Sequence, residues 1–186
     1  MREIEFSRGG FTVFARVLGE PKAPALLYLQ GGPGFPAPRQ RFAWITHALT
    51  RGYQVVLLDQ RGTGRSTRID AATPELIDAK VLSNLRADHI VADAEALREE
   101  MGLARWDVLG QSFGGFCLAH YLAAHPERVG RALFTGGVPS IGEGADGVYR
   151  ATFAKLKHRH QQFNAKYPAA EKMLREVCRH LEVEEE

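Results

Sequence analysis

The chain has 186 residues, of which 45% are hydrophobic and 25% are charged. This mixture is typical of an ordinary soluble globular protein with one domain, or one domain and part of another, and it excludes collagen, coiled coils and long disordered chains. The 24 basic and 22 acidic side chains leave a net charge of +2, so the composition indicates neither a nucleic acid nor an anionic membrane as a partner.

The first third of the chain carries the pattern of β-strands. Residues 11–18 are rich in β-branched and aromatic side chains and end at Gly19. Residues 25–29 and 54–58 are short, almost entirely apolar runs, and the second one stops at Asp59. Such runs are typical of strands that are covered on both faces, as in a parallel sheet between layers of helices.

Strands and helices alternate in the middle of the chain. Residues 85–101 have apolar side chains at spacings of three and four, which predicts an amphipathic helix, and Gly102 stands where its C-terminal cap belongs. Residues 106–109 and 132–135 are predicted strands, and residues 113–125 between them form a predicted helix. This alternation indicates βαβ units and therefore an α/β fold.

The pattern changes after Gly137, because no further strand is predicted. Three glycines predict a loop, namely Gly142, Gly144 and Gly147. Apolar side chains at helical spacing then predict one helix from about residue 146, which Pro168 interrupts, and a second helix after that proline. We therefore expect two parts: a core of residues 1–140 and a helical part of residues 141–186.

The cysteines and the apolar runs of the chain indicate in which cellular compartment the protein is expected. Cys117 and Cys178 are far apart, which predicts neither a disulfide framework nor a zinc site. Residues 1–6 lack the apolar stretch of a secretory signal. The longest apolar run, residues 23–29, is far shorter than the roughly 20 residues of a membrane helix. We expect a soluble protein of the cytoplasm.

The sharpest chemical signal is Gly-Gln-Ser-Phe-Gly at residues 110–114, which fits the pattern G-x-S-x-G. A predicted strand enters this segment and a predicted helix leaves it. In that context a sharp turn exposes the serine hydroxyl, small neighbours let the turn close, and the helix N-terminus favours developing negative charge. We predict that Ser112 is a nucleophile. The alternative, a chance match in a turn, is disfavoured by the flanking strand and helix.

A second signal is Gln-Gly-Gly-Pro-Gly at residues 30–34, directly after the predicted strand 25–29. In serine hydrolases with such a turn, the loop after this strand gives one N–H group to the oxyanion hole, and the residue after the nucleophile, here Phe113, gives the other. Each donor stabilises the transition state by about 3 kcal/mol. A simple glycine turn explains the segment alone equally well. A phosphate loop is disfavoured, because Pro33 has no N–H and the phosphate-binding glycine motifs are missing.

A third signal is Asp-Gln-Arg-Gly-Thr-Gly-Arg-Ser at residues 59–66, after the predicted strand 54–58. Asp59 and the arginines are placed to bridge loops at the carboxyl edge of the sheet, where open α/β sheets bind ligands. We favour a structural role, an ion-paired loop that braces the oxyanion loop, over direct catalysis.

Together the three segments resemble the prolyl aminopeptidase (proline iminopeptidase) family of α/β-hydrolase serine peptidases. The matching residues are 31–34, 59–66 and 110–115, and the resemblance spans most of the chain. The family often has a histidine before the double glycine, where this chain has Gln30. The resemblance implies the α/β-hydrolase fold, a mostly parallel sheet with helices on both faces. It also implies that the helices after Tyr149 begin a helical cap.

The resemblance further implies an activity and its residues. The implied enzyme releases an N-terminal residue, preferably proline, from short peptides without a metal or other cofactor. Ser112 would be the nucleophile, and the N–H groups of Gly32 and Phe113 would be the oxyanion donors. Neither nucleic acid nor a membrane is an expected partner. Another α/β-hydrolase, such as an esterase, and a truncated product without catalysis remain the alternatives.

One departure from the family concerns the catalytic triad. In this fold the triad runs Ser, then Asp or Glu, then His, and each of the last two follows a later strand. No strand pattern follows Thr135, and the later candidates stand on a predicted glycine loop and two predicted helices, namely Asp146, His158, His160 and His180. We therefore expect the N-terminal portion of a longer protein, ending inside the cap. Alone it should be nearly inactive and should associate through the unpaired edge of its sheet.

Overall fold

The structure is a computed structural model that describes residues 1–140, 142 and 144–183. The chain divides into two units, Met1–Pro139 and Ser140–Glu186. The first unit holds every strand of the sheet, and the second consists of two helices. The interpretation of the second unit as the start of a helical cap stays a prediction.

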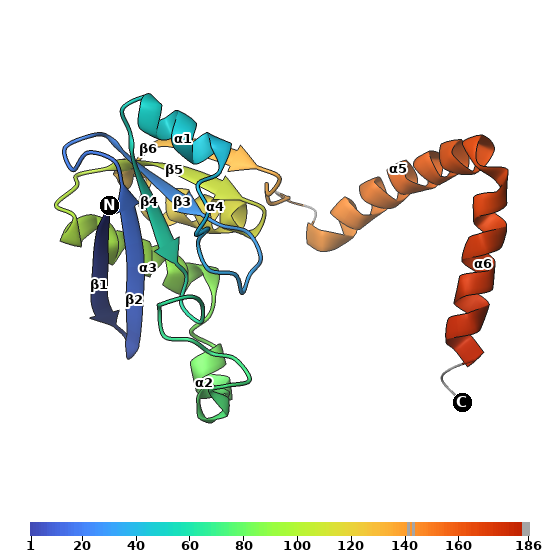
Figure 1. The fold of residues 1–186 in the computed structure, drawn as a ribbon, viewed down its shortest axis with the longest axis horizontal. Coiled ribbons are helices and arrows are strands. Elements are labelled where there is room, and N and C mark those ends of the chain that lie inside the picture. Colours follow the sequence, from blue (N-terminus) through green and yellow to red (C-terminus); the bar gives the residue numbers. More distant parts are fainter. Residues whose placement is uncertain (141, 143, 184–186) are drawn as a thin grey trace. The chain divides into compact units, whose positions relative to one another are not determined.

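The first unit is built on a six-stranded sheet with the order β1-β2-β4-β3-β5-β6 (Figure 1). Its strands are β1 (Arg2–Arg8), β2 (Phe11–Leu18), β3 (Ala25–Leu29), β4 (Gln54–Asp59), β5 (Trp106–Gln111) and β6 (Val129–Thr135). β1, β2 and β4 pair antiparallel in that order, whereas the pairs β3–β4, β3–β5 and β5–β6 are parallel. The carboxyl ends of parallel strands lie at the same edge, so the loops after β3, β4 and β5 meet there.

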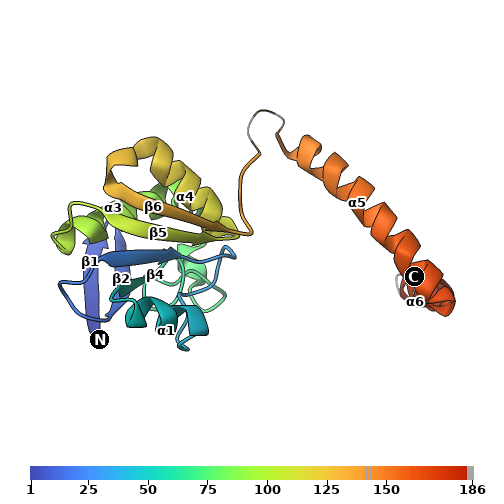
Figure 2. The ribbon, with the colours of Figure 1, turned by 90° about the horizontal axis from the view of Figure 1, so that it is seen from above.

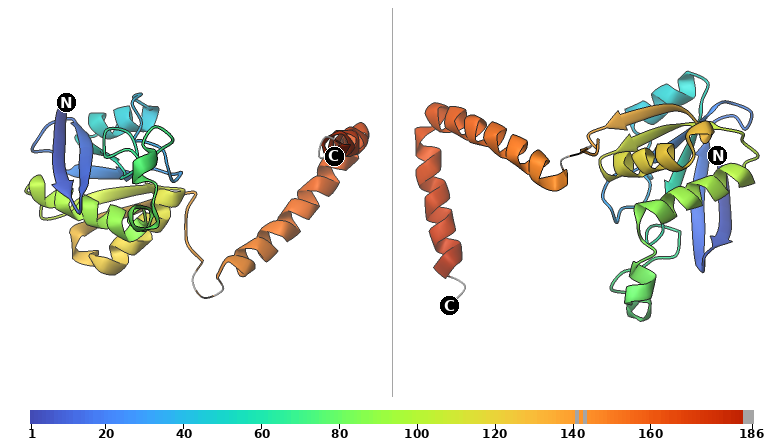
Figure 3. Two further views of the ribbon diagram at one scale, coloured as in Figure 1. Left: turned by 90° about the horizontal axis from the view of Figure 1, so that it is seen from below. Right: turned by 180° about the vertical axis from the view of Figure 1, so that it is seen from behind.

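Helices cover both faces of this sheet. They are α1 (Ala43–Thr50), α3 (Ala87–Glu100) and α4 (Phe113–Ala124). The short helix α2 (Ala79–Leu82) buries no residue and lies in the segment between β4 and α3, and short 3₁₀ turns occur at Pro74–Leu76 and Pro126–Arg128. α3 and α4 lie side by side on one face (Figure 3), and α1 lies on the other (Figure 2). The predicted α/β fold, a mostly parallel sheet with helices on both faces, is confirmed.

Two apolar cores hold these layers together. Successive side chains of β4 point to opposite faces, so Val56 and Leu58 pack toward α3 and α4, and Val55 and Leu57 pack toward α1. All residues of β3 and β4 are buried, as expected for strands that are covered on both faces. β6 differs, because it pairs only with β5 and its Leu133 is 47% exposed. Among the described residues no strand follows β6.

The second unit consists of α5 (Gly144–Lys166) and α6 (Pro168–Val183), two helices that meet at Tyr167. The predicted interruption at Pro168 is confirmed, and this proline opens α6, where its missing N–H costs no hydrogen bond. The predicted glycine loop is partly wrong, because Gly144 begins α5 and Gly147 lies inside it. A glycine costs a helix only about 1 kcal/mol, and Asp146 in the first turn suits the helix dipole.

Large apolar side chains of the second unit lie on its surface. The exposed ones are Val148, Tyr149, Phe153, Leu156, Phe163, Tyr167, Met173, Leu174, Val177 and Leu181. No described residue of α5 is buried. Exposed apolar surface of this extent is typical of helices that pack against something else.

A thiol titration tests the packing of α4. Cys117 on this helix has no exposed surface, and burial raises the pKa of its thiol to about 12, whereas Cys178 on α6 is exposed. Because the thiolate is the reactive form, we expect an aromatic disulfide reagent at neutral pH to modify one thiol in the native chain and both in denaturant. Cys178→Ser is the control and should remove the native reaction. Rapid reaction of both native thiols would contradict the packing of α4.

Candidate active site

Ser112 lies on the turn between β5 and α4. Its φ is 51° and its ψ is −119°, and it is the one residue other than glycine with positive φ among the described residues. Such a conformation costs about 1–3 kcal/mol and persists only where the surrounding structure enforces it. Ser112 is also exposed. A strained, exposed serine between a strand and a helix is the geometry that the G-x-S-x-G pattern predicts.

Neighbouring groups hold this turn in place. The N–H of Ser112 donates to the carbonyl of Thr135 at 2.9 Å, and the N–H of Gly115 donates to the carbonyl of Ser112 at 2.9 Å. Before the turn, the Tyr28 hydroxyl donates to Oε1 of Gln111. Burial raises the pKa of Tyr28, so its hydroxyl keeps its proton at neutral pH.

Glycines around the turn allow neighbouring backbone segments to come closer together than any side chain at these positions would permit. A methyl group at Gly114 would lie 1.8 Å from the carbonyl oxygen of Leu29. A methyl group at Gly137 would lie 1.8 Å from the carbonyl oxygen of Ser112. The strand β3, the turn and the end of β6 are therefore in direct backbone contact, which is why small residues flank Ser112.

Gly114→Ala should destabilise the first unit although Gly114 lies in a helix. Helix propensity alone favours alanine over glycine by about 1 kcal/mol. The clash with Leu29 outweighs it, so we expect a net loss of about 1–3 kcal/mol in the free energy of unfolding, measured in urea. Ala123→Ser, exposed on the same helix, is the control and should change it by less than about 0.5 kcal/mol. A higher urea midpoint for Gly114→Ala would contradict the close contact.

The loop after β3 lies against this turn. We call residues 30–41 the oxyanion loop. A methyl group at Gly31 would lie 2.9 Å from Cβ and 3.5 Å from Oγ of Ser112. Gly32 has a φ of 128°, which glycine tolerates, and its peptide bond to Pro33 is cis. The structure thus brings the loop to Ser112 through Gly31. That the N–H groups of Gly32 and Phe113 together bind one oxyanion stays a prediction.

Asp59, at the end of β4, ties this loop to the next one and is fully buried. Its Oδ1 accepts hydrogen bonds from the N–H of Ala37 at 2.9 Å and from Nη1 of Arg39 at 3.1 Å. Its Oδ2 accepts from the N–H of Arg65 at 2.9 Å and from Nη2 of Arg39. The bracing role that the sequence favoured for Asp59 matches these contacts. Its ionic partner Arg39, however, lies in the oxyanion loop itself, and sequence analysis missed it.

The arginines that follow Asp59 have other partners. Arg61 is buried, and its Nε donates to Oδ2 of Asp93 on α3 at 2.7 Å. Arg65 pairs with Glu3 of β1 at 2.8 Å. The guanidinium groups of both arginines therefore join elements of the first unit to one another.

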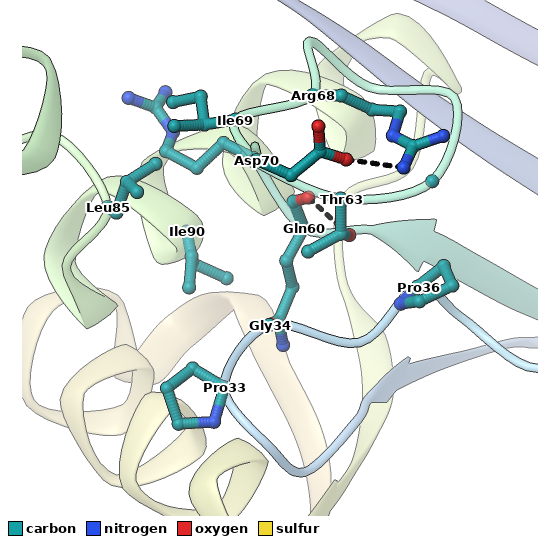
Figure 4. A pocket seen from close by; sticks show the side chains of 13 residues that line it. Pro33, Gly34, Pro36, Gln60, Thr63, Arg68, Ile69, Asp70, Leu85 and Ile90 are labelled. Carbon is teal, nitrogen blue, oxygen red and sulfur yellow. Dashed lines mark hydrogen bonds and ion pairs between the residues drawn. The ribbon is translucent and has the colours of Figure 1, made fainter. Parts of the chain in front are cut away.

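A pocket opens beside the oxyanion loop (Figure 4). Its volume is about 480 Å³. Residues from the loops after β3 and β4 line it together with the start of α3, among them Pro33, Gly34, Gln60, Thr63, Leu85 and Ile90. The carboxyl edge of the sheet, where α/β folds bind ligands, is therefore hollowed beside the oxyanion loop, although Ser112 itself does not line this pocket.

The structure leaves the triad acid and base unassigned. Asp146, His158 and His160 lie on α5 and His180 lies on α6, so none of them follows a strand. Within the described part of the chain, no three His, Cys, Asp or Glu side chains gather into a group that could hold a metal ion. None of the described helices combines the length and the apolar character that crossing a membrane requires.

The mostly parallel sheet, the helices on its two faces and the strained serine define a class of protein. The sequence pattern of the family described as alpha/beta hydrolase fold matches residues 24–179. The chain belongs to this family.

Comparison with proteins of known name shows which members of this family the chain resembles. A proline iminopeptidase of Aeromonas sobria is 44% identical over 183 residues, which cover 92% of this chain and 43% of that protein. A proline iminopeptidase of Aspergillus aculeatus is 34% identical over 192 residues, with 93% and 43% covered. The structure of a proline iminopeptidase-related protein of Thermus thermophilus matches with a TM-score of 0.53 and 29% identity, over 72% of this chain and 44% of that one. The resemblance to proline iminopeptidases is confirmed, and the chain spans less than half the length of these relatives.

Proposed function

We propose that the whole protein to which these residues belong is a serine peptidase that releases an N-terminal proline, or another N-terminal residue, from short peptides. The placement of Ser112 carries this proposal, because an exposed serine with positive φ on a strand-to-helix turn is suited to nucleophilic attack. The 44% identity to the proline iminopeptidase of Aeromonas sobria supports the substrate class.

The proposed reaction proceeds through an acyl-enzyme. Oγ of Ser112 attacks the carbonyl carbon of the first residue, and the N–H groups of Gly32 and Phe113 donate to the oxygen that becomes negative. A general base takes the Ser112 proton and passes it to the leaving amine of the shortened peptide. Water then hydrolyses the ester on Ser112 and releases the free amino acid.

The general base is proposed to come from a part of the whole protein outside these 186 residues. The four late candidates, Asp146, His158, His160 and His180, lie on α5 and α6. In this fold, by contrast, the acid and the base of the triad come from loops after later strands. The cytoplasmic location expected from the sequence stays a prediction.

An assay on the full-length product of the gene that encodes these residues tests the proposal. We expect rapid hydrolysis of a proline anilide and little hydrolysis of the same anilide with an acetylated proline nitrogen, because the proposed enzyme acts at a free N-terminus. Short-chain nitrophenyl esters serve as the comparison. Rapid ester hydrolysis without any anilide hydrolysis would contradict the peptidase proposal and would favour an esterase.

A further inference from the structure

The oxyanion loop depends on side chains for its conformation. Within residues 1–140, all of which are described, no backbone-to-backbone hydrogen bond outside the strands and helices involves residues 31–41. Its glycines also leave the free backbone many conformations. The position of the loop next to Ser112 must therefore be set by groups that reach it from elsewhere, or from one part of the loop to another.

Gln60, the first residue after β4, reaches the beginning of the loop. It is 2% exposed, and its Nε2 donates to the carbonyl oxygen of Gln30 at 3.2 Å. Its own backbone is fixed, because its carbonyl accepts from the N–H of Thr63 at 3.0 Å and from Oγ1 of Thr63 at 2.7 Å. Figure 4 shows the Gln60 side chain running from its loop toward Gly34. Gln60 is thus a donor in a fixed place.

Gln30 extends this contact across the loop. Its Nε2 donates to the carbonyl oxygen of Phe35 at 3.2 Å, so the amide closes the segment that contains Gly31 and Gly32. Its Oε1 is buried and has no hydrogen-bond partner among the described residues. A buried acceptor without a partner destabilises a fold. The hydrogen bond from Gln30 Nε2 to Phe35 is therefore the contact that accounts for a buried glutamine at position 30.

A displacement of the Gln30 carbonyl would shift the backbone that packs against the turn at Ser112. A methyl group at Gly114, two residues after Ser112, would lie 3.0 Å from the carbonyl oxygen of Gln30. The next residue, Gly31, has its own close approach to Cβ of Ser112. Loss of one oxyanion donor lowers kcat by about 10²–10³, and a misplacement of about 1 Å costs about 10².

We propose that Gln60 is a positioning residue for the hydrolysis, whose amide holds the Gln30 carbonyl so that the N–H of Gly32 faces the oxyanion formed at Ser112. In this proposal Gln60 acts through the Gln30 carbonyl and not on the reacting atoms, although its side chain also lines the pocket beside the oxyanion loop. This inference rests on the proposed function, and it adds the residue that orders one half of the oxyanion hole.

The test uses the full-length protein and compares two buried glutamines at opposite ends of β4. Gln60→Met removes the donor and keeps the length of the side chain. Gln54→Met is the matched control, because Gln54 is 1% exposed and its Nε2 donates to the carbonyls of Pro21 at 3.1 Å and Ala23 at 2.7 Å. Gln54 begins β4, about 20 Å from Gln60 at the strand rise of about 3.3 Å per residue.

We expect Gln60→Met to lower kcat for a proline anilide about 10- to 100-fold, with KM changed less than about twofold. The rate at which an organophosphonate modifies Ser112 should fall similarly, because that adduct also carries an oxygen in the oxyanion hole. Gln54→Met should leave kcat within about twofold, although it loses buried hydrogen bonds as well. If Gln60→Met does not fold, Gln60→Asn takes its place, because a side chain shorter by one methylene cannot reach Gln30.

The outcomes separate this inference from the proposed function. An active wild type with a folded Gln60 variant that keeps its kcat would overturn the positioning role alone. An equal loss of kcat in Gln54→Met would also overturn it, since the effect would then be one of stability. A wild type that neither hydrolyses the anilide nor reacts at Ser112 would overturn the proposed function, and the positioning role with it.

Discussion

Ser112→Ala should abolish the hydrolysis of proline anilides and proline amides by the full-length protein and leave its fold intact. Loss of the nucleophile of a serine peptidase lowers kcat by about 10⁴–10⁶. Folding should be unaffected, because Ser112 is exposed and its side chain does not cap α4. Alanine also accepts the positive φ at this position no worse than serine does.

The comparison needs kcat and the free energy of unfolding for both proteins. Ser83→Ala at the C-terminal end of α2 is the matched control, since Ser83 is an exposed serine that follows a helix. We expect it to keep wild-type kcat, and we expect both variants to unfold within about 0.5 kcal/mol of the wild type. Undiminished turnover by a folded Ser112→Ala variant would remove Ser112 from the mechanism.

The 186 residues by themselves should hydrolyse a proline anilide only at a residual rate. Oxyanion donors and substrate binding leave about 10³–10⁴ of acceleration over water when the triad is broken. That is a small part of the rate of an intact serine peptidase, because a serine without its base is a weak nucleophile. β6 also presents an unpaired edge with Leu133 47% exposed, so we expect this chain to associate in solution.

Intact mass establishes that the assayed species consists of these 186 residues, and size-exclusion chromatography reports its association. Robust turnover by this species would show that a general base lies within it. His158→Ala and His160→Ala would then be the first variants to examine, as both residues lie on α5. A strictly monomeric chain would contradict the expected association through β6.

Elements with strong local patterns could be predicted from the sequence. The predicted strands at residues 25–29 and 54–58 correspond to β3 and β4, which the structure extends only by Asp59. One strand and two helices were missed, and the four-residue helix α2 is too short for a periodic pattern. β1 has four charged side chains that are exposed or partly exposed and only two apolar residues, Ile4 and Phe6, so its alternating pattern is short. α1 is short, has no side-chain cap and buries only Ile45 and Ala48, so its periodic signal is weak.

At the candidate site, too, the features formed by neighbouring residues could be predicted and the contacts between distant residues could not. The turn at Ser112 was predictable, because the glycines, the strand and the helix that shape it are adjacent in sequence. The bond between Asp59 and Arg39 joins residues 20 apart, and the bond between Gln60 and Gln30 joins residues 30 apart. Their side chains look like ordinary loop residues until the parallel strands β3 and β4 bring the two loops together.

Mapping an organophosphonate adduct on the full-length protein by peptide mass spectrometry tests whether Ser112 is the nucleophile, because the reagent marks an activated serine irrespective of substrate. We expect one stoichiometric adduct on Ser112, with proline anilide hydrolysis lost in proportion to its formation, and no adduct in Ser112→Ala. An adduct on a different residue, or hydrolysis that persists after complete modification of Ser112, would contradict this role of Ser112.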